Sequence, residues 1–315
     1  MRIALVVDEV LDKYKKKMIK AIQESLDGIY ENEVVPFNED FMRKIKEYDL
    51  AMNIATGGGK EARQLHVASV LDLMGIPYTG SPPLTHAFCI DKSVTKAIVK
   101  QYGIDTPKFI VVRPGESVPE DHGLRYPLLV KLVRQGSSKG LRKESVANNY
   151  NELLESVKWV HEKFNEPALI EEYIDGMELT IAFVEDENGI NILPPMEIDF
   201  SRLPDGIEKF FSDRVKNSGE FDEYIDYYVP ARLDNEELEK VRKVSKRTFE
   251  VLGFRGYGRI DMRIKDGKYH ILEVNSLPML VPDYSNIPLI FEKTGKTYKD
   301  MILSIVNAAK RRFGI

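Results

Sequence analysis

The sequence is poor in the residues that build disulfide and zinc frameworks. It has one cysteine, Cys89, and its five histidines are scattered along 315 residues. A single cysteine excludes an internal disulfide, and without cysteine–histidine clusters a structural zinc site is not expected. The histidine spacing also gives no Ser-His-Asp pattern. Candidate functional residues are therefore sought among the carboxylates, lysines and arginines.

Long apolar runs and an excess of positive charge are also missing. No run approaches the ~20 apolar residues that cross a bilayer, and the apolar start at residues 1–7 is too short for a signal peptide. The formal net charge of -5 argues against general nucleic-acid binding. We expect a cytoplasmic protein with neither a membrane nor a nucleic-acid partner.

The first part of the chain alternates strands and helices. Residues 2–7 and 50–54 have the apolar pattern of buried strands, and residues 11–26 and 62–74 that of helices. This alternation predicts a parallel sheet with crossover helices, and thus a Rossmann-like α/β domain over residues 1–90.

The rest of the chain has a mixed α+β pattern. Residues 91–180 are predicted to form a central domain and residues 181–315 a C-terminal domain, in keeping with two or three domains for this length. The patterns predict helices at 91–102, 151–164 and 235–252, strands at 108–112, 128–132 and 168–173, and an irregular segment at 200–228.

A hairpin near residues 258–275 combines two acids, an arginine and an asparagine at alternating positions. A two-residue turn at Asp266 and Gly267 is expected to put the two strand acids, Asp261 and Glu273, on opposite faces. A three-residue loop that starts at Lys265 brings them onto one face. The second register leaves a clean apolar face and is preferred. It places Arg259, Asp261, Glu273 and Asn275 on one face, and Ile260, Met262, Ile264, Leu272 and Val274 on the other.

The polar face of this hairpin suits a magnesium ion. Mg²⁺ takes oxygen ligands, usually one or two carboxylates together with phosphates and water. Asp261, Glu273 and Asn275 offer such a set. The alternative is an ordinary wet face of an antiparallel hairpin.

Four further features have a functional and a plain structural interpretation. The loop at residues 136–140 could bind phosphate through its backbone and serines, or be a flexible hairpin tip. Lys131, inside an apolar strand, needs a partner unless it lies at an exposed strand end. The acids at residues 171–178 could border an adenine site, although a solvated turn is favoured. Gly57–Gly59 could bind an anion at the start of a helix or form a tight turn. Because the GxGxxG spacing is missing, binding of a nicotinamide cofactor is disfavoured.

Taken in order, these blocks resemble the ATP-grasp superfamily and, within it, the D-alanine–D-alanine ligases. The matching stretches are residues 75–81, 91–96, 130–131, 136–138, 171–178, 258–261 and 273–278. The resemblance implies an ATP-grasp architecture behind the N-terminal Rossmann-like domain, and small amino-acid or peptide substrates. It also implies ATP with two Mg²⁺ ions, Mn²⁺ being an alternative, and a homodimer, which is common in this type of ligase.

The resemblance also implies roles for individual residues. Lys96 and Lys131 correspond to lysines that hold ATP phosphates, and Gly136, Ser137 and Ser138 to the flap above them. Glu171, Glu172 and Ile174 match the adenine hinge, Glu178 the ribose contact, and Asp261, Glu273 and Asn275 the magnesium ligands. Arg259, Ser137 and Lys216 are the catalytic candidates, with Arg259 stabilising an oxyanion.

The implied reaction has two steps, and the departures from the family lie on its substrate side. A carboxylate attacks the γ-phosphate of ATP, and an amine then displaces phosphate from the acyl phosphate. Residues 7–12 lack the family's GGxSxExxVS motif, so Glu9 is a candidate substitute for its glutamate. Asn217 replaces a tyrosine beside Lys216, Met279 replaces a glycine, and Ser285 aligns near the family's carboxylate-binding serine. The alternatives are a ligase for another amino acid or peptide, and an ATP-binding regulatory protein without catalysis.

Overall fold

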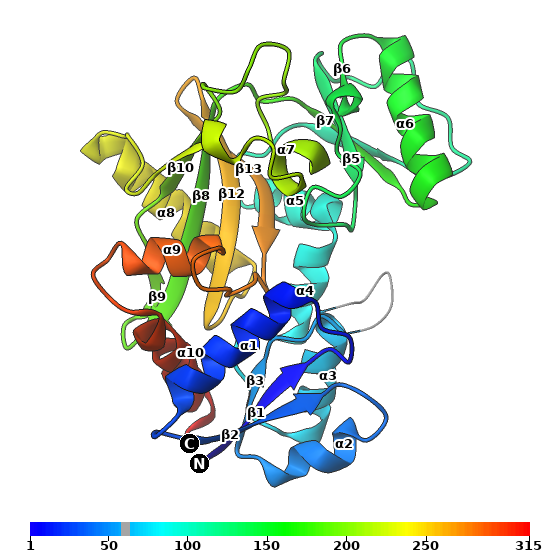
Figure 1. The fold of residues 1–315 in the computed structure, drawn as a ribbon. Coiled ribbons are helices and arrows are strands. Elements are labelled where there is room, and N and C mark those ends of the chain that lie inside the picture. Colours follow the sequence, from blue (N-terminus) through cyan, green and yellow to red (C-terminus); the bar gives the residue numbers. More distant parts are fainter. Residues whose placement is uncertain (58–63) are drawn as a thin grey trace.

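The N-terminal part is built on a parallel sheet, as predicted (Figure 1). The computed structural model describes residues 1–57 and 64–315. The sheet order is β2-β1-β3, and β1 pairs in parallel with both neighbours. Its strands are β1 Arg2–Val7, β2 Glu31–Pro36 and β3 Leu50–Asn53. The helices of this part are α1 Lys13–Leu26, α2 Phe41–Lys44, α3 Leu65–Met74 and α4 Pro83–Ile90.

Both faces of this sheet are covered, because side chains alternate along β1. Ile3 and Leu5 pack with α1 and with the C-terminal helix α10, Tyr298–Phe313. Ala4 and Val6 pack with α2 and α3 on the other face. The helix α10 also packs against β8 of the C-terminal sheet, so it joins the first and last parts of the chain.

The central part is a four-stranded antiparallel sheet of order β4-β7-β5-β6. Its strands are β4 Phe109–Val112, β5 Leu128–Leu132, β6 Val146–Ala147 and β7 Ala168–Glu172, preceded by helix α5 Lys92–Gln101. Helix α6, Tyr150–Phe164, covers one face through contacts with Val130 and Ile170. The opposite face therefore presents the alternate residues, which include Lys131 and Glu171.

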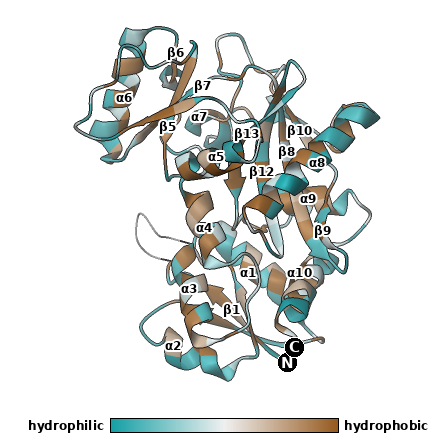
Figure 2. Cartoon of the chain, turned by 180° about the vertical axis from the view of Figure 1, so that it is seen from behind, coloured by the Kyte–Doolittle hydropathy of each residue, from teal (hydrophilic) through white to brown (hydrophobic). Residues whose placement is uncertain are grey.

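The C-terminal part is a six-stranded sheet of order β11-β10-β8-β12-β13, with β9 also paired to β8. Its elements are β8 Met177–Asp186, β9 Gly189–Ile192, β10 Met196–Asp199, β11 Asp226–Tyr228, β12 Tyr257–Lys265, β13 Lys268–Asn275, α7 Asp213–Asn217, α8 Asn235–Val251 and α9 Asn286–Glu292. One face packs Ile260, Met262 and Val274 against Phe249 of α8. Hydrophobic residues gather along these strands, and hydrophilic ones along the outer sides of α6 and α8 (Figure 2).

The hairpin of β12 and β13 has the predicted faces but a different turn. Lys265 pairs with Lys268, so the loop is the two-residue Asp266-Gly267 turn and the three-residue loop was wrong. Both turn residues have positive φ, as this tight turn requires. A register shift after Asp261 makes Leu272 an extra residue and sets Asp261 opposite Glu273.

The bulge also changes one member of the apolar face. Ile271, and not Leu272, is buried beside Met262 in the core under α8. A one-residue shift exchanges the faces of a strand, so the bulge brings both acids onto one side despite the short turn.

The segment 200–228 is more ordered than its sequence predicts. It contains α7, a 3-10 helix at Asp222–Tyr224 and β11. Phe200, Val215 and Phe221 belong to a small core of its own. We propose that the three sheets mark three domains, close to residues 1–90, 91–180 and 181–315.

Candidate active site

The site lies where the open face of the central sheet meets the β12–β13 hairpin. Lys131 is only 9% exposed and Glu171 2%, and the Lys131 Nζ lies 2.6 Å from the Glu171 Oε1. Because Lys131 stands opposite Leu169 on β7, the two charged side chains are diagonal neighbours on one face. Lys131 is thus a buried, paired cation, and the alternative of an exposed strand end was wrong.

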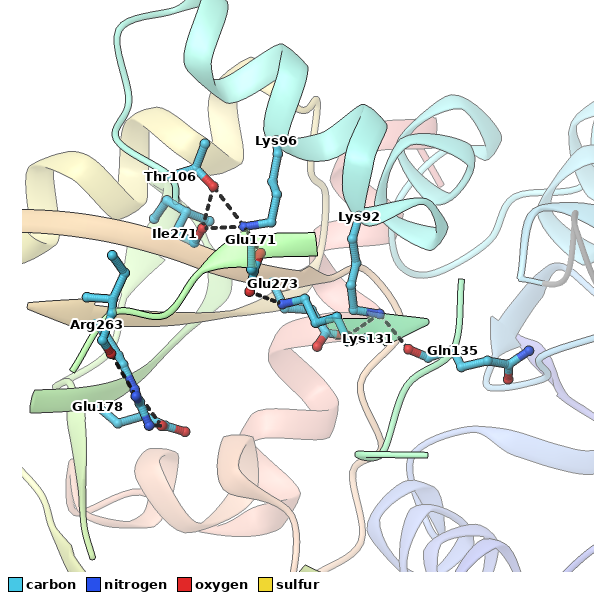
Figure 3. Close-up of polar contacts among 11 residues, drawn as sticks. Lys92, Lys96, Thr106, Lys131, Gln135, Glu171, Glu178, Arg263, Ile271 and Glu273 are labelled. Carbon is cyan, nitrogen blue, oxygen red and sulfur yellow. Dashed lines mark hydrogen bonds and ion pairs between the residues drawn. The ribbon is translucent and has the colours of Figure 1, made fainter. Parts of the chain in front are cut away.

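Helix α5 supplies a second lysine to the same carboxylate (Figure 3). The Lys96 Nζ lies 2.9 Å from the Glu171 Oε2 and donates to the Thr106 hydroxyl at 2.9 Å and the Ile271 carbonyl at 3.3 Å. Burial raises the pKa of Glu171, but Lys131 and Lys96 outweigh it and hold that pKa below its usual value. Glu171 is therefore an anion that fixes two ammonium groups.

Lys92 completes the cationic cluster, although it was absent from the predicted site residues. It precedes Lys96 by one helical turn, so the two side chains leave the same face of α5. The Lys92 Nζ donates to the Gln135 carbonyl at 2.5 Å and lies 3.6 Å from the Glu273 Oε1. The i, i+4 spacing of these lysines was the available sequence signal. Lys92 thus links the central sheet to the hairpin.

The polar face of the hairpin holds its acids in fixed positions. Asp261 accepts hydrogen bonds from Thr180 at 2.9 Å, Arg259 at 2.8 Å and the amide of Asn275 at 3.3 Å. Burial raises the pKa of Glu273, but Lys92, Lys131, Arg259 and Lys216 outweigh it and lower that pKa. The predicted grouping of Arg259, Asp261, Glu273 and Asn275 on one face is confirmed.

Lys216 and Arg259 bring two more cations to this face. Burial lowers the pKa of Lys216, and the nearby Arg259 lowers it further against the opposing effect of Asp261 and Glu273. Lys216 of α7 is therefore close enough to the hairpin to feel the charges of Arg259, Asp261 and Glu273. The Nε of Arg259 is buried and has no hydrogen-bond partner within the described residues. An anionic oxygen would satisfy that donor.

The loop 136–140 contacts the segment that carries Lys216. Ser137 and Ser138 both have positive φ, and Gly140 has φ +75 with a Cβ position only 2.8 Å from the Phe164 ring. The backbone of Leu141 accepts a hydrogen bond from the Asp213 amide at 2.8 Å, and the Asn217 side chain donates to the Ser137 carbonyl at 3.4 Å. The loop 136–140 and its neighbour Leu141 therefore lie in contact with α7 of the segment 200–228.

The three glutamates of residues 171–178 have different partners. Glu172 points to the face opposite Glu171 and accepts from the backbone amide of Arg125 at 3.1 Å and its guanidinium at 3.2 Å. Glu178 pairs with Arg263 at 2.7 Å, and the carbonyl of Ile174 accepts from the same guanidinium at 2.7 Å. Glu172 does not join the lysine cluster, and its backbone amide donates to the Lys108 carbonyl at 3.0 Å.

The carboxyl end of β1 carries Asp8, which was not predicted as a site residue. Its carboxylate accepts from the Thr56 hydroxyl at 2.7 Å and the Gly57 amide at 2.8 Å, and it pairs closely with Lys15.

The other substrate-side candidates have different surroundings. Glu9 is exposed. Residues 58–63, which include part of the predicted glycine turn, lie outside the described residues. Ser285 is buried and accepts from the Val281 amide at 3.1 Å.

The donor set of the hairpin fits magnesium. Within residues 1–57 and 64–315, no group of three or more His, Cys, Asp or Glu side chains forms a metal site. Two carboxylates with one amide oxygen still match Mg²⁺, which takes its remaining ligands from phosphate and water. The positive charge around Glu273 also suits a polyphosphate. Asp261, Glu273 and Asn275 would hold the ions.

The two antiparallel sheets that enclose this charged site, with a Rossmann-like domain before them, form the ATP-grasp fold. The chain belongs to the D-alanine–D-alanine ligase family. The family model described as the C-terminus of D-ala D-ala ligase matches residues 98–307.

Named relatives cover most of the chain. The D-alanine–D-alanine ligase of Pseudothermotoga lettingae is 31% identical over 286 residues, which are 89% of each protein. The Vancomycin B-type resistance protein VanB of Enterococcus faecalis is 31% identical over 81% of this chain and 71% of its own. A crystal structure of the Bacillus anthracis D-alanine–D-alanine ligase complexed with ATP has a TM-score of 0.79 and 27% identity, covering 100% of this chain and 99% of that one. None of the described helices could span a membrane.

Proposed function

We propose that this protein is an ATP-dependent carboxylate–amine ligase that joins two small amino acids, with D-alanine as the first candidate for both. The observation that carries the proposal is the convergence of cations on Glu171 and the two hairpin acids. Lys92, Lys96, Lys131, Lys216 and Arg259 surround three carboxylates, Glu171, Asp261 and Glu273. Such a site has positive charge in excess, which suits a triphosphate with its metal ions.

The nucleotide is assigned to the space between the two sheets. Lys96 and Lys131 would hold its phosphates beneath the loop of Gly136, Ser137 and Ser138. The backbone of Glu171, Glu172 and Ile174 would border adenine, and Glu178 would accept from the ribose. Two Mg²⁺ ions, or Mn²⁺, held by Asp261, Glu273 and Asn275 would neutralise charge on the phosphates.

The proposed chemistry has two displacement steps. A carboxylate oxygen of the first substrate attacks the γ-phosphorus, the bond to the β–γ bridging oxygen breaks, and ADP leaves. The amine of the second substrate then attacks the acyl carbon, loses a proton and expels inorganic phosphate. Lys216 and Ser137 would steady the transferring phosphoryl group, and Arg259 the oxyanion of the tetrahedral intermediate.

Contact between the loop 136–140 and the segment 200–228, which would act as two flaps, supports protection of the acyl phosphate. Asn217 reaches the backbone of Ser137 in the loop, and the Asp213 amide reaches the carbonyl of Leu141 directly after it. Closure of these segments would keep water away while the amine attacks. The inactive regulatory alternative is not favoured, because Arg259 and all three metal ligands lie together on the hairpin.

Release of phosphate from ATP tests the function directly. We expect release that depends on an added amino acid, with a dipeptide of matching mass as the product. D-Alanine, other D- and L-amino acids and small peptides should be compared. No amino-acid-dependent release with any of them would contradict the proposal.

A ligase for a different first substrate is a second candidate, and Asp8 favours it. This carboxylate is already engaged by Lys15, Thr56 and Gly57, so it is not free to receive a substrate ammonium. A screen in which another amino acid or a peptide exceeds D-alanine as first substrate would support this candidate. We further propose a cytoplasmic location and a homodimer, which light scattering of the purified protein would test.

The buried lysine cluster predicts a pH-dependent affinity for ATP. Burial lowers the pKa of Lys96 below the ordinary lysine value of about 10.4. Since only the ammonium form attracts phosphate, the Kd for ATP should rise as the pH passes upward through that lowered pKa. Lys96→Arg should move this rise to higher pH, because arginine stays charged.

Calorimetric titration of the protein with ATP measures this effect. The amino acid is left out, because its amine would also change protonation over the same pH range. Burial also lowers the pKa of Lys92 and Lys216, so the same measurement on Lys92→Arg and Lys216→Arg shows how the effect is divided among the three lysines. An identical pH profile for the wild type and Lys96→Arg would contradict the assignment of Lys96.

A further inference from the structure

Arg263 is a buried arginine that lies beside the assigned nucleotide site. It is 4% exposed and comes two residues after Asp261 on the polar face of β12. In the sheet register it stands opposite Glu178 of β8. A buried guanidinium is tolerated only where its donors find acceptors. Its partners therefore indicate what this residue does.

The pairing with Glu178 uses only one carboxylate oxygen. The Nε of Arg263 lies 3.0 Å from the Glu178 Oε2, and the Nη2 lies 2.7 Å from the same atom. Among the described residues, Oε1 of Glu178 accepts no hydrogen bond. Arg263 thus fixes the position of the carboxylate and leaves one oxygen available as an acceptor (Figure 3).

The other donors of Arg263 join two separate segments. Its Nη1 donates to the Ile174 carbonyl at 2.7 Å, and its Nη2 donates to the Lys209 carbonyl at 3.0 Å. The guanidinium also lies over the Tyr173 ring, at 5.1 Å from its centre. The Arg263 side chain therefore connects Glu178 with the residues after β7 and with the segment 200–228.

The turn before β8 is built for this close approach. A Cβ added to Gly176 would lie 2.1 Å from the carbonyl oxygen of Ile264, the residue after Arg263. Only glycine lets the turn rest against β12 at this point. The distance between the Ile174 carbonyl and the guanidinium is thus set by the backbone.

We propose that Arg263 is a positioning residue that aims the free oxygen of Glu178 at a hydroxyl of the nucleotide sugar. It also anchors the segment 200–228 at Lys209, before α7, so that the same side chain supports both sugar recognition and this segment. This inference rests on the proposed function, because it takes Glu178 as the sugar contact. The ligand class it specifies is a nucleotide with a complete ribose, in preference to its deoxy analogues.

Binding of ATP, 2′-deoxyATP and 3′-deoxyATP, measured by calorimetry with Mg²⁺, tests the inference apart from turnover. The wild type should bind ATP about tenfold more tightly than at least one deoxy analogue, as expected for a hydrogen bond to a charged group. In Arg263→Met the ratio between the Kd for this deoxy analogue and the Kd for ATP should fall toward one. Arg232→Met is the matched control, since Arg232 pairs with Glu197 and Asp199 in the same sheet outside the site, and it should keep the wild-type preference.

A double variant keeps the test valid if Arg263→Met leaves Glu178 as an uncompensated charge and fails to fold. In Glu178→Gln/Arg263→Met the unpaired charge is gone. If Arg263 acts through Glu178, the double variant should discriminate between sugars no less than Glu178→Gln alone. A further loss in the double variant, an unchanged preference in folded Arg263→Met, or equal binding of all three nucleotides by the wild type would overturn the inference. A wild type that discriminates between sugars but shows no ligase turnover would instead refute the proposed function.

Discussion

Glu273→Gln is expected to lower kcat by about 10³-fold, because the substitution removes the charge that would bridge the metal ions, and loss of one preorganised electrostatic group costs up to this much. The carboxylate lies 3.6 Å from the Lys92 ammonium and within the field of Lys131, Arg259 and Lys216. The neutral amide has the same shape, so the site should stay assembled while its metal affinity falls. Phosphate release at saturating ATP and D-alanine, across a range of Mg²⁺ concentrations, measures the effect.

The control for Glu273→Gln is the same change at Glu197. This glutamate is also buried in the C-terminal sheet and paired to a cation, Arg232, but it lies outside the site. Glu197→Gln should lower thermal stability and leave kcat within about twofold, because substitutions away from the reacting groups act through stability. Near-normal turnover of Glu273→Gln at ordinary Mg²⁺ would contradict the metal assignment.

Arg259→Lys is expected to lower kcat by about 10²-fold to 10³-fold, the usual effect of losing an oxyanion donor. The guanidinium is held by Asp261 at 2.8 Å, and its buried Nε has no partner within the described residues. A lysine keeps the charge but lacks the planar guanidinium that holds Asp261 with one nitrogen and directs a donor on another nitrogen toward the oxyanion. The substitution should therefore slow attack at the acyl carbon more than it weakens ATP binding.

Comparing the two half-reactions distinguishes this role from a general loss of structure. Isotope exchange between the bridging and non-bridging oxygens of ATP reports the first step, and dipeptide formation reports the second. Arg259→Lys should retain much of the exchange and lose product. If both fall together by the same factor while the Kd for ATP rises, Arg259 serves the phosphates and the oxyanion role is wrong.

The hairpin illustrates how far local patterns reach. Alternation along β12 and β13 predicted which side chains share the polar face, and the pairing of Asp261 with Glu273 agrees. The turn was predicted wrongly, because Ile271 and Leu272 are both apolar and either could fill the core. Packing under α8 selects Ile271. The extra residue is then absorbed as a bulge, which no rule of strict alternation predicts.

The three neighbouring glutamates illustrate where local patterns stop. Their composition alone favoured a solvated turn, yet Glu171 is buried between two lysines, Glu172 faces Arg125, and Glu178 faces Arg263. Neighbouring residues of a strand point to opposite faces, so their partners come from different layers of the fold. Lys92 was missed because its partners come from distant parts of the chain. The Gln135 carbonyl lies 43 residues away, and Glu273 belongs to another sheet.

The sequence by itself determined the Rossmann-like start, the strands that carry the site and the oxygen-rich face of the hairpin. These follow from periodicity and side-chain chemistry, which act over a few residues. Only the tertiary structure decided which cation meets which carboxylate, that Asp8 is already engaged, and that Arg263 joins Glu178 to the segment 200–228. Those outcomes depend on burial, because a charge removed from water must find its partner wherever the packed layers bring one.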